Sequence, residues 1–449
     1  MGGILNNKET TIMSTVKGNE ERAVLATPKR IVLEPTTRCN LACRMCVKQS
    51  GEQAICEGDM APATFAHLAS VLPQAEAVTF SGIGEPLLHP RLEELIAQAQ
   101  TLLPQTAQIG MQSNGVLMTP QRARSLLQAG LSRICLSVDG SSPELFSRIR
   151  RGGQLGDLEQ AFAILDRARR ESGRSLQLGA QYVLQRDNVE QLPAAVEWAA
   201  GQGVDFFLVT HLLPYGEAAL SQSLFPLSTD ASRALFQRKR REAEQQGLDL
   251  FHYFQVRWKY NKSSAEKRLV RFVEDMVQEA ANQGIALNLG LLLQETDIAV
   301  DEVESSFVRA EQRAAQCGVE LSLPALAPTF QRHCAFVEDG CTFIAWDGSV
   351  HPCYYLWHTY STWRKGQRKP IQAKVFGHVD REDLKAVWNC PEYRSFRKQV
   401  VSYEYPYCWE CTFFPCNMVD TDAFETDCYT LEVPCGDCPW GQGIVQCLR

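Results

Sequence analysis

Short apolar segments alternate with amphipathic segments over the first half of the chain. The apolar, β-branched runs predict strands at residues 30–34, 77–81, 108–113, 133–138, 176–184 and 206–210. Between them, helical periodicity predicts helices at residues 62–72, 91–103, 120–129, 156–171 and 189–202. Strands that alternate with helices form parallel sheets with right-handed crossovers. The pattern therefore predicts an α/β fold, a partial (β/α)6 TIM-type barrel, with a doubly wound open sheet as the alternative.

This alternation changes after Pro214. Charged amphipathic segments predict helices at residues 228–246, 265–283 and 301–316, and two apolar runs predict short strands at 285–293 and 319–323. From His333 onward the chain is rich in cysteine, aromatic residues, proline and glycine, and has little periodicity. A region of this kind needs more than an apolar core to hold it, and bound metal would serve.

The pattern divides the chain into four expected regions. They are a flexible N-terminal segment (1–28), a core barrel (29–213), the barrel end with a helical insertion (214–328), and a C-terminal cysteine-rich Fe–S domain (329–449).

Composition narrows the class of protein. With 449 residues, 45% hydrophobic and 22% charged, the chain is an ordinary globular sequence. Its net charge of −7 gives no support to a nucleic-acid partner, which requires a basic surface. The sequence has no run of 18 apolar residues and no apolar signal segment near its start, so we expect no membrane span and a cytoplasmic location.

The chain has 17 cysteines, and three of them are clustered in the loop after the first predicted strand. In reducing compartments such thiols more often bind metal than form disulfides. Cys39, Cys43 and Cys46 follow the spacing CxxxCxxC. Three thiolates can hold one compact inorganic centre and leave a fourth position open, which is typical of catalytic metal sites. The alternatives are a zinc site completed by a distant residue, or thiols without a ligand.

This segment resembles the hallmark CxxxCxΦC of the radical S-adenosylmethionine (SAM) superfamily, with Met45 where that family usually has an aromatic residue. Three further motifs follow successive predicted strands. Ser81–Pro86 is similar to the family's GGEP motif with Ile83 inserted, Gln112–Gly115 to TNG, and Ser137–Gly140 to SxDG. Each motif alone is weak, but the four in order are specific.

The resemblance implies a cofactor and a chemistry. Cys39, Cys43 and Cys46 would hold a [4Fe–4S] cluster whose open iron binds S-adenosyl-L-methionine. One electron would cleave SAM to a 5′-deoxyadenosyl radical, which abstracts hydrogen from the substrate. The residues implied in SAM binding are Gly82, Gly84 and Glu85 for the methionine amine, and Ser113, Ser137 and Arg150 for the ribose or carboxylate. The pattern singles out no catalytic acid or base.

Eleven cysteines lie beyond residue 333 and include two CxxC pairs, Cys408/Cys411 and Cys435/Cys438. Paired thiolates at this spacing chelate metal across a tight turn. The region is similar to the SPASM extension of radical SAM enzymes, which carries auxiliary [4Fe–4S] clusters, and Gly348–Cys353 matches its Gx4C element. A zinc ribbon is the alternative.

The SPASM resemblance implies one or two auxiliary clusters. The first would use Cys334, Cys341, Cys353 and Cys428, and the second Cys408, Cys411 and Cys416 with Cys435 or Cys438. The family spacing CxxCx5CxxxC is not kept, because only four residues separate Cys411 from Cys416 and no cysteine stands at the final position. The fourth ligands therefore stay open.

The whole chain most resembles the SPASM subgroup linked to the maturation of metalloenzymes such as tungsten oxidoreductases. We expect a radical SAM enzyme that modifies a protein, a peptide or a metal cofactor. Its implied partners are a protein or peptide substrate, with a tungsten or molybdenum oxidoreductase as a candidate, and an electron donor such as ferredoxin or flavodoxin. The alternatives are an enzyme that crosslinks or epimerises a ribosomally made peptide, and a non-enzymatic Fe–S or zinc scaffold.

Overall fold

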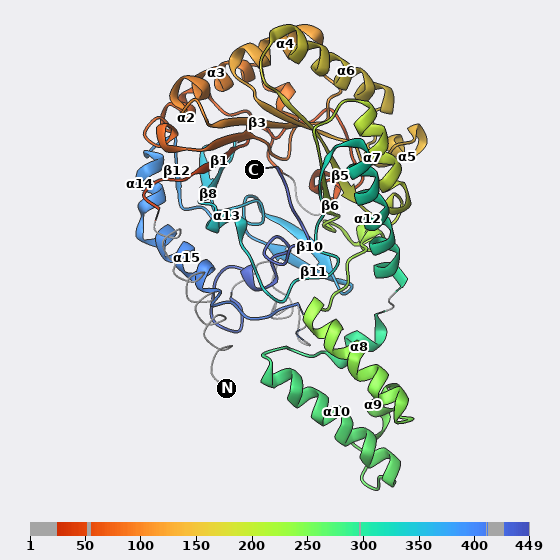
Figure 1. Cartoon of the computed structure of the whole chain (residues 1–449). Helices are drawn as coiled ribbons and strands as arrows, with labels where there is room; N and C mark the ends of the chain where they lie inside the picture. The colour runs from red at the N-terminus through yellow and green to blue at the C-terminus, as the bar shows by residue number, and fades with distance from the viewer. Residues whose placement is uncertain (1–24, 52–54, 296–297, 410, 412–425, 449) are drawn as a thin grey trace, which may run out of the picture.

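The computed structural model describes residues 25–51, 55–295, 298–409, 411 and 426–448. A curved, mainly parallel sheet lies at its centre, and helices cover the outer side of that sheet (Figure 1). Neighbouring strands follow one another in sequence order and in parallel, which confirms the α/β fold and the partial barrel. These strands are β1 (Arg30–Leu33), β2 (Ala77–Phe80), β3 (Gln108–Ser113), β4 (Arg133–Ser137), β5 (Gln177–Leu184) and β6 (Phe206–His211).

The crossover helices bury an apolar face against this sheet, as the periodicity predicts. Helix α2 ends earlier than expected, and α5 precedes the expected helix at 156–171. Helix α4 begins at a proline and ends at Gly130 in the left-handed conformation, which is a common pair of helix boundary signals. The helices are α2 (Pro62–Ala66), α3 (Leu92–Leu102), α4 (Pro120–Ala129), α5 (Pro143–Ile149), α6 (Leu155–Ser172) and α7 (Leu192–Gly201).

Later parts of the chain extend the sheet at both edges. Strand β7 (Glu320–Ser322) pairs with β6, as the predicted strand at 319–323 requires. At the opposite edge, β8 (Cys341–Ile344) pairs in parallel with β1, followed by the antiparallel strands β9 (Ser349–His351) and β12 (Gly377–His378). The first strand of the cysteine-rich region is therefore a direct neighbour of the strand that leads into Cys39.

The insertion forms an arm with a core of its own, which projects from the barrel (Figure 1). Its helices are α8 (Asp230–Gln245), α9 (Tyr253–Val256), α10 (Ser264–Asn282) and α11 (Leu289–Gln294). The strand predicted at 285–293 is wrong, because Asn288 accepts a hydrogen bond from the Leu291 amide (3.1 Å) and starts α11 there. Helix α12 (Ile298–Cys317) then returns to pack against α7.

The C-terminal region packs against the strands that it adds beside β1, since α13 contacts β8 and α14 contacts β12. It comprises α13 (Ala335–Glu338), the hairpin β10 (Tyr360–Arg364) and β11 (Gln367–Ile371), and the helices α14 (Leu384–Asn389) and α15 (Pro391–Ser402). Its last described residues run along the inside of the sheet (Figure 1), where Leu448 packs against Cys135 and Phe206. Within the described ranges, no helix is both long enough and apolar enough to cross a membrane.

Candidate functional site

A pocket of about 180 Å³ lies at the carboxyl ends of β1 to β4. Four successive loops reach it, because parallel strands place the loops that follow them at one edge of the sheet. The structure brings together here all nine residues that the N-terminal motifs single out. They are Cys39, Cys43, Cys46, Gly82, Gly84, Glu85, Ser113, Ser137 and Arg150.

The three thiols of this pocket are shielded from water to different degrees. Cys43 is buried, whereas Cys39 and Cys46 are half-buried. Burial raises the pKa of all three thiols, that of Cys46 to about 11. A bound metal deprotonates its thiol ligands, and its charge replaces the lost hydration of the thiolates. These thiols are therefore poor free nucleophiles at neutral pH and suitable metal ligands.

Glu85 ties the loop after β2 to the loop after β3. Its buried carboxylate accepts hydrogen bonds from the Ser113 hydroxyl (2.7 Å) and from the Asn114 amide (2.7 Å). Asn114 in turn points its side-chain amide at the Cys39 sulfur, at 3.9 Å. Gly84 lies so close to the first loop that an added Cβ would come within 2.3 Å of the Thr36 carbonyl oxygen. Only glycine allows this approach.

Arg150 carries a positive charge to the cysteine loop. Its guanidinium binds the fully buried Asp139 carboxylate (2.6 Å), and its Nη1 lies 3.8 Å from the Cys43 sulfur. Asp139 also accepts a hydrogen bond from the Val183 amide (2.6 Å), which fixes its position. Burial acts to lower the pKa of Arg150, but the Asp139 carboxylate and the Cys43 thiol raise it above its ordinary value. The guanidinium therefore stays charged beside the thiol.

A partly buried contact between a carboxylate and a histidine joins the loops of this pocket to the C-terminal region. Glu34, directly after β1, accepts a hydrogen bond from the Ile83 amide (2.9 Å). The same carboxylate lies 3.0 Å from Nε2 of His358, which follows Cys353 by five residues in the chain. An added Cβ on Gly82 would come within 2.4 Å of the Glu34 side chain. Glu34 thus fixes the Gly82–Glu85 loop through the Ile83 amide, and His358 contacts the same Glu34 carboxylate.

Sequence reasoning assigned no role to Asn114, Asp139, Glu34 or His358. Asn114 and Asp139 stand inside the quoted motifs, so the motif positions carried a signal for them. Glu34 and His358 are far apart in the sequence, and a lone histidine is more often an ordinary polar contact. Only the pairing of β8 with β1 brings their segments together.

A second cluster of thiols surrounds an enclosed pocket in the C-terminal region. Its four cysteines are Cys334, Cys353, Cys435 and Cys438, and most of the remaining wall is apolar or aromatic. Burial raises the pKa of Cys353 and Cys435 well above the ordinary thiol value, and the neighbouring thiols raise it further. All four thiols line this one pocket and could therefore hold one shared centre.

The expected grouping of the C-terminal cysteines differs from this arrangement. Cys341 lies in β8 and does not line the pocket, and Cys428 is exposed. Cys341 is the first residue of β8, where the pairing with β1 places it opposite Arg30. Cys408 lies near the Cys435–Cys438 turn, because a Cβ on Gly436 would come 2.8 Å from its sulfur. Cys411 is half-buried, and Cys416 lies outside the described residues.

The donor sets of both pockets fit iron–sulfur clusters. The first pocket presents three cysteine thiols, with the Met45 thioether also in its wall, and the second presents four cysteine thiols. In the described part of the chain, no three His, Cys, Asp or Glu side chains are close enough to hold a single metal ion.

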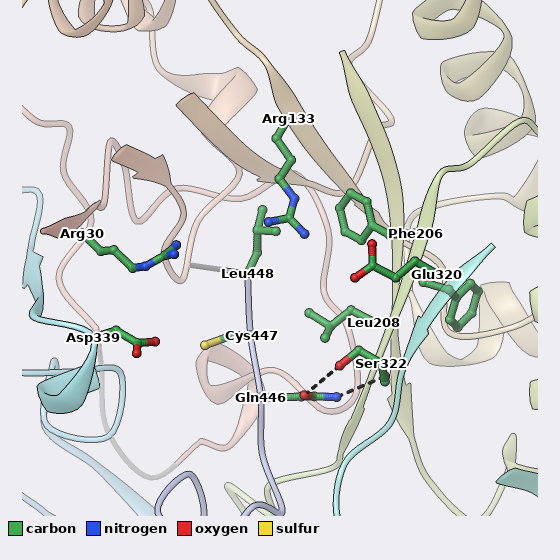
Figure 2. A pocket seen from close by; sticks show the side chains of 11 residues that line it. Arg30, Arg133, Phe206, Leu208, Glu320, Ser322, Asp339, Gln446, Cys447 and Leu448 are labelled. Atoms are coloured by element: carbon green, nitrogen blue, oxygen red, sulfur yellow. Dashed lines mark hydrogen bonds between the residues drawn. The ribbon is translucent and has the colours of Figure 1, made fainter. Parts of the chain in front are cut away.

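A further pocket, of about 240 Å³, opens at the other ends of the strands (Figure 2). Arg30, Arg133 and Glu320 are the first residues of their strands, and they line it together with the tail residues Gln446 and Leu448. Figure 2 shows the Gln446 side chain hydrogen-bonded to Ser322, so the tail is tied to β7. None of the predicted site residues lies in this pocket.

Comparison with known proteins places both cysteine regions in described families. Residues 33–199 match the family model of the radical SAM superfamily, and residues 334–412 match that of SPASM, an iron–sulfur cluster-binding domain. The tungsten-containing aldehyde ferredoxin oxidoreductase cofactor-modifying protein of Pyrococcus furiosus is 26% identical over 425 residues, which is 93% of this chain and 97% of that protein.

Other similar proteins match a smaller part of the chain or have lower sequence identity. GTP 3',8-cyclase 1 of Pseudomonas aeruginosa is 32% identical over 36% of this chain, which spans about half (49%) of that cyclase. The crystal structure of Streptococcus suis SuiB bound to S-adenosylmethionine covers 88% of this chain and 74% of its own, with a TM-score of 0.48 and 12% identity. The radical SAM model covers the loops of the first pocket, and the SPASM model covers Cys334 and Cys353 of the second but ends before Cys435 and Cys438. The chain is a radical SAM superfamily enzyme with a SPASM iron–sulfur domain.

Proposed function

We propose that Cys39, Cys43 and Cys46 hold a [4Fe–4S] cluster with one iron left open for SAM. Gly82, Gly84, Glu85, Ser137 and Arg150 would then contact SAM. The observation that carries this proposal is the convergence of nine motif residues from four loops on one pocket. Ser113 would affect SAM binding indirectly, because its hydroxyl donates a hydrogen bond to the Glu85 carboxylate.

When bound, the cluster and SAM supply the one-electron chemistry that produces a 5′-deoxyadenosyl radical. The chain's own residues position and shield these groups. Arg150 keeps a positive charge beside Cys43, which stabilises that thiol as a thiolate ligand. Glu85 and Glu34 hold the Gly82–Glu85 loop from two sides, so its backbone groups are fixed before SAM arrives.

We further propose that Cys334, Cys353, Cys435 and Cys438 hold an auxiliary [4Fe–4S] cluster. Four thiols in an enclosed apolar pocket leave no open position, which suits electron transfer or a structural role rather than ligand exchange. Cys408, Cys411 and Cys416 are the remaining candidates for a second auxiliary cluster. Its fourth ligand is not assigned.

The substrate that we propose is a protein, a peptide or a metal cofactor, with maturation of a metalloenzyme as the favoured role. Similarity over nearly the full length to a protein that modifies the cofactor of a tungsten oxidoreductase supports this choice. An acidic electron donor of the ferredoxin or flavodoxin type would supply the electron, and a reducing cytoplasm would preserve the thiolates.

Anaerobic reconstitution tests this function. The protein with iron, sulfide, SAM and dithionite should release 5′-deoxyadenosine, and the triple variant Cys39→Ala/Cys43→Ala/Cys46→Ala should release none and lose about four irons. The matched control is Cys56→Ala/Cys317→Ala, which removes two exposed thiols outside both pockets. Release of 5′-deoxyadenosine by the triple variant would overturn the assignment. Faster turnover with a precursor peptide than with an oxidoreductase would replace metalloenzyme maturation by peptide modification.

A further inference from the structure

The arm carries exposed aromatic side chains where its helices turn, far along the chain from either cysteine pocket. Trp258 and Tyr260 are 83% and 97% exposed, and Phe251 is 60% exposed. The arm does not need them for folding, because its own core consists of other residues, among them Leu269 and Met276. Large aromatic groups left in water at one place mark an interaction surface.

Positive charge surrounds these aromatic side chains. Residues 250–271, which we name the arm tip, contain six lysines and arginines against the single acidic residue Glu266, a net charge of +5. The whole chain has a net charge of −7, so all other residues together carry −12. Glu266 is bonded to Lys259 (2.7 Å) and caps α10, so it neutralises Lys259 and leaves five cations for a partner.

The side chains of the arm tip are ordered against one another. The Arg257 guanidinium lies over the rings of Phe254 (5.1 Å) and Trp258 (5.3 Å). Tryptophan, tyrosine and arginine are the residues that contribute most binding energy in protein interfaces, and a pre-stacked arginine loses less entropy on binding. A bilayer surface would instead require one continuous apolar helix face, whereas here cations and aromatic residues are interleaved along a four-residue helix and a turn.

We propose that the arm tip docks a folded partner protein through an acidic patch on that protein's surface. The net positive charge of the arm tip fits such a patch, and Trp258 and Tyr260 would bury their rings against it. The projection of the arm from the barrel (Figure 1) lets it reach a partner that stands beside the barrel. The choice of partner rests on the proposed function, in which the substrate is carried by a protein. The arm tip then selects the protein, while the barrel pocket performs the chemistry.

The test measures binding of the full reconstituted chain to a tungsten-containing aldehyde ferredoxin oxidoreductase without its cofactor. Two variants change the arm tip: Trp258→Ala/Tyr260→Ala and Lys267→Glu/Arg268→Glu. Their matched controls are Tyr429→Ala, a residue 59% exposed elsewhere, and Arg124→Glu/Arg167→Glu on the barrel helices. We expect both arm-tip variants to raise Kd at least about tenfold and the controls to leave it unchanged. Added salt should weaken binding of the unmodified chain.

The outcomes separate this inference from the proposed function. Release of 5′-deoxyadenosine from SAM alone should be equal in all these variants, because none touches the cysteine pockets. If the unmodified chain releases none, the proposed function fails. If it does release it but binds no oxidoreductase, or the arm-tip variants bind as well as the controls, the docking inference is overturned. Binding of phosphatidylglycerol vesicles or duplex DNA in place of the protein, lost on the same substitutions, would also overturn it.

Discussion

The two cysteine pockets differ in the walls that surround their thiols. In the N-terminal pocket, three cysteines share the wall with a charged arginine, a buried carboxylate and amide groups, and this pocket is the more open of the two. In the C-terminal pocket, four cysteines are enclosed by mainly apolar and aromatic side chains. A more open wall that includes polar groups allows a ligand to enter and be oriented, whereas a less open, almost wholly apolar wall holds its contents and excludes water.

This difference shows how one chain can separate two uses of the same ligand type. The missing fourth thiol in the first pocket is matched by polar groups that can orient an incoming ligand. The complete set of four in the second pocket needs no such groups. The contact between Glu34 and His358 joins the Gly82–Glu85 loop of the first pocket to the C-terminal region.

Removing one thiol from each pocket should give the largest and most contrasting effects. We expect Cys43→Ala to abolish release of 5′-deoxyadenosine, since two thiolates hold the first cluster poorly. We expect Cys353→Ala to lose up to about four irons from the second pocket and to lower Tm, while SAM is still cleaved. Iron analysis and a SAM cleavage assay measure both. Equal loss of SAM cleavage in the two variants would remove the contrast.

Breaking the Arg150–Asp139 pair should be the next largest effect. Arg150→Met leaves the Asp139 carboxylate buried and unpaired, at a cost of about 3 kcal/mol of unfolding free energy. The double variant Arg150→Met/Asp139→Asn should recover part of that stability but not SAM affinity. Thermal unfolding and SAM binding measure the two quantities separately. Unchanged SAM affinity in the single variant would exclude Arg150 from the SAM site.

Weakening the contact between Glu34 and His358 should have a moderate effect on SAM affinity. His358→Gln weakens the support of Glu34, so the Ile83 amide and its loop should be less ordered. We expect the Kd for SAM to rise roughly three- to tenfold, in line with about 1 kcal/mol for a buried hydrogen bond, with iron content unchanged. His67→Gln, at an exposed position, is the control. A loss of iron instead would make His358 a part of the C-terminal cluster site.

The smallest effects should come from replacing Cys341 or Cys428, which do not line the second pocket. Cys341→Ala should cost only the packing of a small buried side chain, and Cys428→Ala should be neutral because its thiol is exposed. We expect both variants to keep their full iron content. Loss of about four irons in either one would restore the grouping that the sequence suggested.

The predictability of the two pockets from sequence follows from how each is built. Cys39, Cys43 and Cys46 share one loop, and parallel strands bring the other motif loops to the same edge, so strand order alone placed nine residues together. Cys334 and Cys438 are about a hundred residues apart, and their meeting depends on the fold between them. The SPASM resemblance grouped Cys341 with Cys353, but Cys341 lies in β8 and does not line the second pocket.

The fold shows the same limit. Strands β1 to β6 were predictable because each is an apolar run between helices. The pairing of β8 with β1 was not, because it joins segments that are some three hundred residues apart. The apolar run at 285–293 fits a strand or a buried helix equally well, and the cap at Asn288 decides for the helix.

The central claim is that the first pocket holds a cluster that binds SAM directly, and the second does not. Electron paramagnetic resonance of the dithionite-reduced protein, with and without SAM, tests it most directly. We predict that SAM changes one cluster signal, and that the Cys39→Ala/Cys43→Ala/Cys46→Ala variant lacks that signal and keeps one that SAM leaves unaltered. A SAM-sensitive signal that survives in this variant would contradict the account.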